Sequence, residues 1–478
     1  MSESSNAPKG AGSKFSKREK SWILYDWANS VYATIMMAAV FNAFFTALVD
    51  DPRGGDYWWS IGTMISMLLV AVLAPLVGAF ADYKSHKKKL FAFFLLLGLA
   101  ATALCAILDD WRFLLAGYIL SNIGFNGCNI LYDSFLPDVT SPERMDTVSG
   151  WGYAMGYIGG STVPFLMSIA LIQFGGALGL GTAGAVKCSV LLTVLWWGLF
   201  SIPFLRNVRQ ESYVEKPREG VLRHTLQNAF TAGKAIVQNK PLFLFVLAYF
   251  FYIDGVGTII NLATSYGTQL GLGMLGMIFA LLVTQLVAFP CSILFSRLAK
   301  KTGGLNMLTV AVSVYVLICV VGFFMGFLIE GAEIPAKLGA LSSAGVIAPQ
   351  GGNLSAINAS LAAAGIEEGA WNLDPAYVLA LSRSTLLFWV LALLVGTVQG
   401  GIQALSRSFF GKLTPPEKSG EYFGFFEIFG KFAAILGPML YALTKAFTGR
   451  SSFSILSIVV LFVAALVILT TQRRFLPK

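Results

Sequence analysis

Polar side chains recur at helical spacing inside four long apolar stretches of the sequence. Residues spaced by three or four positions share one face of a helix, so each set would form a polar stripe. Such a surface inside an apolar helix is suited to binding a solute or carrying a proton. The four stripes are Asp254, Thr258, Asn261 and Ser265; Asn122, Asn126, Asn129 and Asp133; Gln399, Gln403 and Arg407; and Asp26, Asn29, Ser30 and Thr34.

Asp254 is the deepest ionisable residue among these stripes. It lies about 18 Å into its helix at about 1.5 Å per residue, near the middle of a membrane. A charged side chain there costs about 2.5–3.5 kcal/mol on insertion scales, so a function is expected. We hypothesise that Asp254 couples transport to protons or binds a substrate amine. Asp26 lies nearer a helix end, where gating or structural capping competes evenly with coupling.

The other polar residues leave a structural alternative open. Asn, Gln, Ser and Thr side chains also join membrane helices by hydrogen bonds, and this interpretation is favoured for any single Ser or Thr. Glu427 and Lys431 stand four residues apart and can neutralise one another, although Lys431 is also a candidate for an anionic substrate group. The stripes on four helices are the main evidence for a transport site.

The composition requires these stripes to lie in membrane-spanning helices. Only 12% of the 478 residues are charged and 56% are hydrophobic, which excludes soluble and disordered chains. Long unbroken apolar runs indicate helices rather than a barrel. An all-α polytopic protein with twelve transmembrane helices is predicted, in the runs Trp22–Val49, Trp58–Ala81, Leu90–Leu108, Phe113–Tyr132, Val148–Ile172, Val186–Leu205, Leu242–Tyr266, Met274–Phe295, Met307–Ile329, Thr385–Leu405, Tyr422–Ala446 and Phe453–Thr471.

Basic residues predict the orientation. With cytoplasmic termini, 26 of the 34 lysines and arginines fall on the inner side, as expected for a multi-pass protein of the cytoplasmic membrane. A basic rim against anionic lipid also explains the net charge of +9 better than nucleic-acid binding. The predicted units are a leader (1–21), a six-helix half (22–205), a central cytoplasmic loop (206–240) with one amphipathic helix near Leu222 to Val237, a second half (241–472) with an outer loop (330–382), and a tail (473–478).

An internal repeat relates the two halves. The stretch Asp133 to Arg144 matches Arg407 to Lys418 at one constant offset, which continues without a gap. Matching pairs are Ser134 and Ser408, Thr140 and Thr414, Pro142 and Pro416, Glu143 and Glu417, Gly150 and Gly424, and Pro164 and Pro438. Two six-helix halves in parallel repeat match the major facilitator fold, in which helices one, four, seven and ten line a central cavity between the halves.

Two features of the sequence indicate gating residues. Asp133 and Arg407 stand at equivalent positions with opposite charges, so we hypothesise that they approach each other at the cytoplasmic mouth; separate pairing within each half is an equal alternative. The loop after the second helix, Gly78-Ala-Phe-Ala-Asp82, followed by Lys84 and Lys87, resembles the superfamily's loop motif. This resemblance implies a structural-switch role for Gly78 and Asp82, while positive-inside charge explains the lysines equally well.

The chain also resembles a narrower family, the vacuole-effluxer or autophagy-related permeases. The similar segments are Trp22-Ile-Leu-Tyr-Asp-Trp-Ala-Asn-Ser30, Tyr252-Ile-Asp-Gly-Val256 and Gln399-Gly-Gly-Ile-Gln-Ala-Leu-Ser-Arg-Ser-Phe409. The resemblance implies a secondary transporter, and its eukaryotic members suggest amino-acid efflux. Tyr83 and Ser85 depart from the superfamily's loop pattern, so the loop is expected to be less rigid.

The expected function is secondary active transport of a small solute, driven by protons. A phosphate-binding loop of the Gly-x-x-x-x-Gly-Lys type is absent from the sequence, so ATP is not expected as the driver. Five separate cysteines and two histidines in loops predict neither a metal site nor a cofactor. We expect a monomer with a small-molecule substrate, protons and membrane lipids as partners, and no nucleic acid. Export of amphiphilic or lipid-like compounds is the alternative, followed by a polytopic membrane enzyme.

Overall fold

The computed structural model describes residues 14–217, 219–269, 274–330, 375–432 and 435–473. Among these residues, twelve helices or helix pairs are long and apolar enough to cross a membrane, as predicted. The described part of the chain is helical apart from loops and an isolated bridge between Tyr83 and Val214. The expected outer loop 330–382 lies almost wholly outside the described residues, which resume at Pro375.

The first half of the chain supplies six spans, several of them interrupted. The first and fifth spans each contain a π-helical turn, at Ala33–Ala38 and Gly156–Thr162. The helices of this half are α1 (Lys17–Tyr32), α2 (Val40–Leu48), α3 (Gly55–Ala81), α4 (Lys87–Ile107), α5 (Trp111–Ser134), the short α6 (Leu136–Val139), α7 (Pro142–Met155), α8 (Val163–Phe174) and α9 (Thr182–Asn207).

The second half follows a short additional helix, α10 (Val221–Gln238), which corresponds to the predicted amphipathic helix. Its spans are formed by α11 (Lys240–Gln269), α12 (Met274–Thr302), α13 (Gly304–Glu330), α16 (Pro375–Leu413), α17 (Ser419–Phe432), α18 (Leu436–Thr448), α19 (Ser451–Ser457) and α20 (Val459–Gln472).

Several helix boundaries differ from the sequence prediction, and α16 begins at Pro375 rather than Thr385, inside the expected outer loop. α1 begins at Lys17 rather than Trp22, because Ser16 and Glu19 form a reciprocal capping box ahead of the apolar run. α16 continues to Leu413, beyond the predicted end at Leu405, so Arg407 lies in the same helix as Gln399 and Gln403 of its stripe. A prediction from hydropathy ends a span at the first polar residues. In the structure the helix continues beyond them, because neighbouring helices cover those residues.

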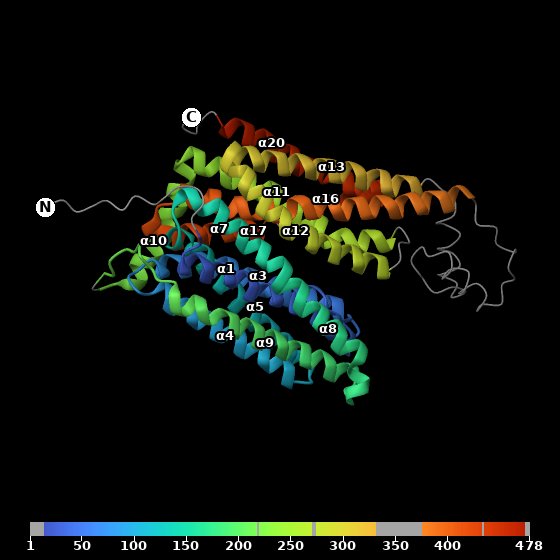
Figure 1. The fold of residues 1–478 in the computed structure, drawn as a ribbon, viewed down its shortest axis with the longest axis horizontal. Helices are drawn as coiled ribbons and strands as arrows, with labels where there is room; N and C mark the ends of the chain where they lie inside the picture. The colour runs from blue at the N-terminus through green and yellow to red at the C-terminus, as the bar shows by residue number, and fades with distance from the viewer. Residues whose placement is uncertain (1–13, 218, 270–273, 331–374, 433–434, 474–478) are drawn as a thin grey trace.

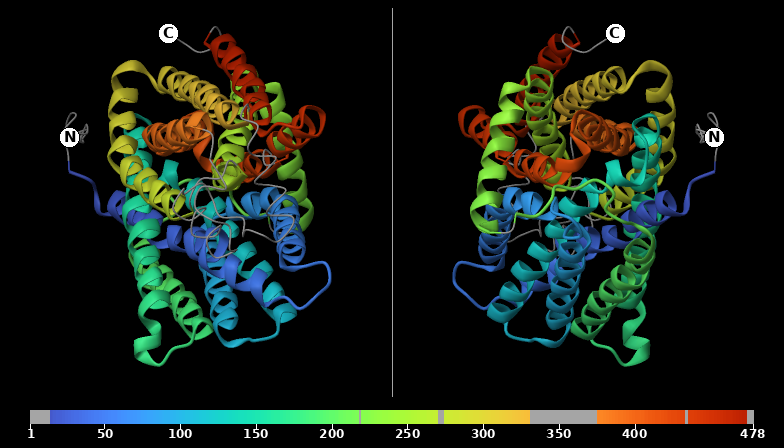
Figure 2. Two further views of the ribbon diagram at one scale, coloured as in Figure 1. Left: turned by 90° about the vertical axis from the view of Figure 1, so that its right-hand side faces the viewer. Right: turned by 90° about the vertical axis from the view of Figure 1, so that its left-hand side faces the viewer.

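Each half has its own hydrophobic core. One buried cluster runs from Trp22 to Val208 and a second from Ala232 to Leu469. The halves also cross in a symmetric way, because α3 packs on α17 and its repeat equivalent α12 packs on α7. The two groups of helices are seen end-on in Figure 2.

The halves meet closely at one end of the bundle, which we call the terminal end because α1 begins and α20 ends there. Figure 1 shows the two groups of helices together at this end and diverging toward the other. The polar contacts between α3, α5, α7, α16 and α17 described below lie at the terminal end. The fold therefore brings residues of both halves into one site.

Candidate functional site

Arg407 of α16 is the centre of a polar cluster between the halves. Its side chain is buried and donates from Nη1 to Asp133 at 3.0 Å and from Nη2 to Asp26 at 3.0 Å. Nε donates to the hydroxyl of Ser149 at 2.9 Å. The two carboxylates come from α5 and α1 in the first half, so one guanidinium of the second half joins three helices of the first.

Three aromatic rings surround the same guanidinium. Its central carbon lies 4.5 Å from the ring centre of Trp22, 4.4 Å from Tyr153 and 5.2 Å from Tyr132. Rings at this distance stabilise a cation and exclude water from it. They hold Arg407 in one orientation, in which its planar group reaches both carboxylates.

The cluster contains more acid than base. Asp26 and Asp133 are 7% and 8% exposed, and Arg407 supplies one positive charge for the two carboxylates. An uncompensated charge is costly when it is buried, so this imbalance of charge sets the cluster apart from an ordinary ion pair. The hypothesised approach of Asp133 to Arg407 is present as geometry, and Asp26 joins the same contact.

A cavity of about 240 Å³ adjoins this cluster at the interface of the halves. Its polar walls carry both signs of charge, with Asp133 and Arg407 on one side and Glu427 and Lys431 on another. Glu427 and Lys431 form the expected pair at 3.7 Å and both remain partly exposed. The rest of the lining includes Gln403, Tyr153, Tyr249, Phe426 and Ser406.

Asp254 lies apart from this cavity, in α11. Its carboxylate accepts the backbone N–H of Gly437 at 3.0 and 3.1 Å, and the Thr258 hydroxyl donates to it at 3.4 Å. Gly437 is in the first turn of α18, so the carboxylate occupies the position of a helix cap. Asp254 and Thr258 are buried together, whereas Asn261 of the same stripe is exposed.

The amide stripes are joined mainly to one another. Asn29 of α1 donates to Asn129 of α5 at 2.8 Å, and Asn126 donates to the side chain of Asn122 at 2.7 Å. The first contact joins two helices, which is the alternative that the sequence left open, whereas the second lies within α5. Gln399 lines a separate, mostly apolar cavity of about 130 Å³ within the second half.

Gly78 and Asp82 lie at a seam between α3 and α17. Asp82 accepts the backbone N–H groups of Gly420 at 2.7 Å and Glu421 at 2.8 Å. A Cβ on Gly78 would lie 2.1 Å from the carbonyl oxygen of Gly420, so these backbones touch only because residue 78 is glycine. Asp82 lies just beyond the spanning part of α3, and burial raises its pKa to about 7, although Lys87 and the two N–H groups favour the carboxylate.

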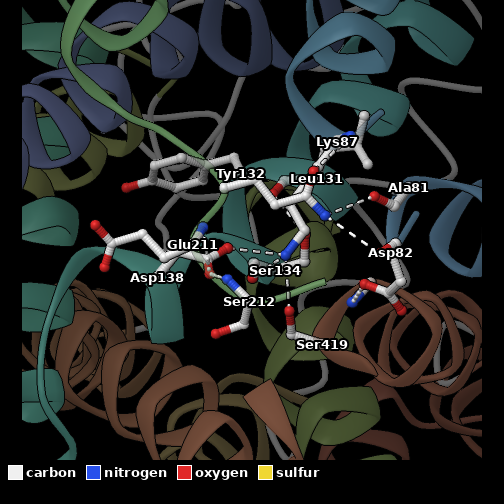
Figure 3. Close-up of polar contacts among 12 residues, drawn as sticks. Ala81, Asp82, Lys87, Leu131, Tyr132, Ser134, Asp138, Glu211, Ser212 and Ser419 are labelled. Carbon is white, nitrogen blue, oxygen red and sulfur yellow. Dashed lines mark hydrogen bonds and ion pairs between the residues drawn. The ribbon is translucent and has the colours of Figure 1, made fainter. Parts of the chain in front are cut away.

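Lys87 is a second component of the seam, shown in Figure 3. Its buried ammonium donates to Asp138 at 3.0 Å, to the hydroxyl of Ser419 at 2.8 Å and to the carbonyl of Ser134 at 3.3 Å. Ser419 opens α17 in the second half, so Lys87 also joins the halves. Positive-inside charge, the alternative for this loop, does not account for a lysine that is 0% exposed.

The sequence reasoning missed a third contact between the halves. Asp146 of α7 lies 2.6 Å from Lys412 and accepts the hydroxyl proton of Ser408 at 2.7 Å. The repeat could have indicated Lys412 and Asp138, one residue from each of the last two contacts. They stand at equivalent positions with opposite charges, as Asp133 and Arg407 do. No such relation marks Lys87 or Asp146.

Comparison with known proteins decides the family. A model of the family described as "Vacuole effluxer Atg22 like" matches residues 60–340 and 383–473. The chain belongs to this family. Among curated relatives, the uncharacterized MFS-type transporter YxiO of Bacillus subtilis (strain 168) is 40% identical over 97% of this chain and 96% of its own. Autophagy-related protein 22 of Coccidioides immitis (strain RS) is 24% identical over 83% of this chain and 69% of its own.

Solved structures show that the Atg22-like chain has the major facilitator fold. The human organic anion transporter MFSD10 superposes with a TM-score of 0.62 at 14% identity, covering 95% of this chain and 99% of that one. The transporter FucP in its outward conformation gives 0.60 at 12% identity, covering 95% and 97%. This Atg22-like protein is thus a multi-pass membrane transporter of the major facilitator type.

Proposed function

We propose that this protein is a proton-driven secondary transporter of small zwitterionic solutes, such as amino acids or short peptides. It would work by alternating access between its two halves. The observation that carries the proposal is the cavity between the halves, whose walls bear carboxylates and cations together. A solute with an ammonium and a carboxylate complements such walls, whereas a purely apolar compound leaves them unpaired.

The accessible pair is the proposed binding element. Arg407 is already bonded to two carboxylates and a hydroxyl, so it has little capacity left for a ligand. Lys431 and Glu427 are 3.7 Å apart and partly exposed. The carboxylate of a zwitterion can bind Lys431 in place of Glu427, and its ammonium can bind Glu427 in place of Lys431. Tyr153, Tyr249 and Phe426 supply ring surface for the remainder of the solute.

Cavity size favours small solutes over the amphiphile alternative. The volume of about 240 Å³ falls below the range of about 300–1,000 Å³ typical of pockets for drug-sized ligands. Efflux is the proposed direction, in keeping with the family description. We propose that the protein lies in the plasma membrane with its terminal end facing the cytoplasm, because most basic residues lie at that end.

Two positions compete for the coupling proton. Asp254 is the one predicted from sequence, and its carboxylate also caps α18. The Asp26–Arg407–Asp133 cluster has an excess carboxylate and contacts both halves, so a proton bound there would change the contact that joins them. We favour the cluster, with Asp254 retained as the second candidate.

Transport by purified protein in proteoliposomes tests the proposal. A library of labelled amino acids, dipeptides and amphiphilic dyes is offered with and without an imposed pH gradient. We expect gradient-dependent flux of zwitterions, lost in Lys431→Gln and Glu427→Gln and retained in the exposed control Lys301→Gln. Flux of dyes alone would support the amphiphile alternative, and unchanged zwitterion flux in both cavity variants would refute the binding element.

The same assay separates the two proton positions. Asp26→Asn is expected to uncouple flux from the gradient while exchange of solute down its own gradient continues. Asp254→Asn is expected to lower the amount of folded protein but leave the coupling of the remaining protein intact. The reverse pattern would return the coupling role to Asp254.

A further inference from the structure

The α10 helix exposes a stripe of apolar side chains, although it is not one of the twelve membrane-spanning helices. Its inner face is buried through Thr225, Ala229, Ala232 and Ile236. On the outer side, Leu226, Phe230 and Val237 are 48%, 78% and 60% exposed. The three are spaced at i, i+4 and i+11, so they form one continuous stripe along the helix.

Polar residues flank this stripe in a regular order. Proceeding around the helix from the apolar stripe, the exposed bases Arg223 and Lys234 come next. Beyond them lie exposed Gln227, Thr231 and Gln238. An apolar stripe bordered by bases and then by uncharged polar residues is the pattern of helices that lie in a membrane surface. Long basic side chains at such a border extend toward headgroups while their stems cover apolar area.

The connection to α11 fixes the depth of α10. α10 ends at Gln238, and the membrane-spanning α11 begins at Lys240 after a single intervening residue. The C-terminal end of α10 is therefore held where α11 enters the membrane, at the level of headgroups. Figure 2 shows α10 at the edge of the bundle, beside α3 and α11 and not over its centre. An occupant at that edge and level is lipid.

We propose that α10 is an interfacial helix that inserts Leu226, Phe230 and Val237 into the leaflet at the terminal end and binds anionic headgroups through Arg223 and Lys234. Occupation by anionic lipid would stabilise the contact between the halves. The membrane contact itself does not depend on the substrate or proton coupling proposed above. Only the assignment of the leaflet as the cytoplasmic one rests on the proposed orientation.

Contacts with both halves link α10 to the seam. The Thr225 hydroxyl lies 3.4 Å from the hydroxyl of Tyr83, the residue after Asp82. On the other side, a Cβ on Gly233 would lie 2.9 Å from the ring of Phe425 in α17. α10 thus packs on α3 and α17, the two helices joined by the bonds from Asp82. Lipid that holds α10 in place holds both partners of that seam.

Membrane insertion is tested first, on full-length protein. An environment-sensitive NBD fluorophore is attached at Phe230→Cys in a variant whose native cysteines are replaced, reconstituted in nanodiscs. We expect blue-shifted emission that is quenched by brominated lipid and protected from aqueous iodide. The matched site Thr231→Cys, on the polar arc, is expected to respond to iodide. Iodide quenching at both sites would overturn the proposal and indicate an aqueous partner for the stripe.

Lipid dependence is tested second, by labelling Gln403→Cys in the cavity with a thiol reagent added at the terminal end. We expect slower labelling in discs with phosphatidylglycerol than in pure phosphatidylcholine. Arg223→Gln with Lys234→Gln should weaken binding to anionic lipid by up to about thirtyfold, since each base near an anionic surface contributes about fivefold, and the lipid effect on labelling should fall with it. The control Lys300→Gln with Lys301→Gln removes two exposed bases outside α10. Equal lipid responses in the two double variants would refute headgroup binding, whether or not transport is observed.

Discussion

Replacing Gly78 by alanine is expected to open the terminal end of the transporter. The added Cβ would lie 2.1 Å from the carbonyl oxygen of Gly420 and 2.6 Å from its carbon. Both contacts are to backbone, which cannot rotate away as a side chain can. α3 and α17 must therefore separate by about 1 Å or more before van der Waals contact is restored.

Such a separation removes the bonds that Asp82 accepts. Gly420 N and Glu421 N lie 2.7 and 2.8 Å from the carboxylate, and an added 1 Å takes both beyond hydrogen-bond distance. Each bond stabilises the closed contact by about 0.5–1.5 kcal/mol if the acceptor is neutral and by about 1.5–3 kcal/mol if it is charged. The loss of about 1–6 kcal/mol shifts the equilibrium between closed and open terminal ends by at least about fivefold.

Thiol labelling measures this shift. With Gln403→Cys as the reporter, Gly78→Ala should accelerate labelling by a reagent added at the terminal end. Gly257→Ala is the matched control, because that helical glycine has no atom within 4 Å of its ideal Cβ. Labelling of Gly78→Ala at the rate of Gly257→Ala would show that the two backbones do not form a closing contact.

Three further outcomes are expected. Burial raises the pKa of Asp82 to about 7 in the closed form, above the value of about 3.9 expected in water, so closure binds the proton. Labelling of the cavity, measured relative to Asp82→Asn to cancel the ionisation of the thiol itself, should speed up as the pH rises from about 4 to about 7 and level off above it. Lys87→Met should destabilise the protein by about 3–5 kcal/mol in thermal unfolding, because it leaves Asp138 buried beside an apolar group. Adding Asp138→Leu should recover part of this loss, and no recovery would argue against the Lys87–Asp138 ion pair. Gly159→Ala places a Cβ 1.8 Å from the ring of Trp27 and should lower Tm, whereas Gly198→Ala, with its nearest contact at 3.5 Å, should not; equal Tm values would contradict the packing.

Sequence patterns predicted the features that depend on local composition or on the repeat. Apolar runs predicted the twelve spans, the amphipathic pattern predicted α10, and the repeat placed Asp133 opposite Arg407. The burial of Lys87 was not predictable in this way. Its partners Asp138 and Ser419 are far from it in sequence, and only the packing of α4 on α5 and of α17 on α3 and α5 brings them together.

Asp254 was singled out from the sequence, but its partner was not. Its depth in an apolar run singled it out as a candidate, but depth does not reveal a partner. That partner is the backbone N–H of Gly437, a group present at nearly every residue and therefore invisible as a sequence motif. Its role as a proton site stays a prediction, and Asn261 of the same stripe lies exposed.

The contact between Asp133 and Arg407 bears on how such a chain could arise. The two residues are equivalent positions of the repeat and lie 3.0 Å apart across the interface of the halves. In an ancestor assembled from two identical six-helix chains, this contact would have joined two copies of the same residue. Two aspartates or two arginines at that distance do not both stay charged. An opposite-charge contact at these equivalent positions therefore requires that the two copies changed separately, so two identical halves could not have made it.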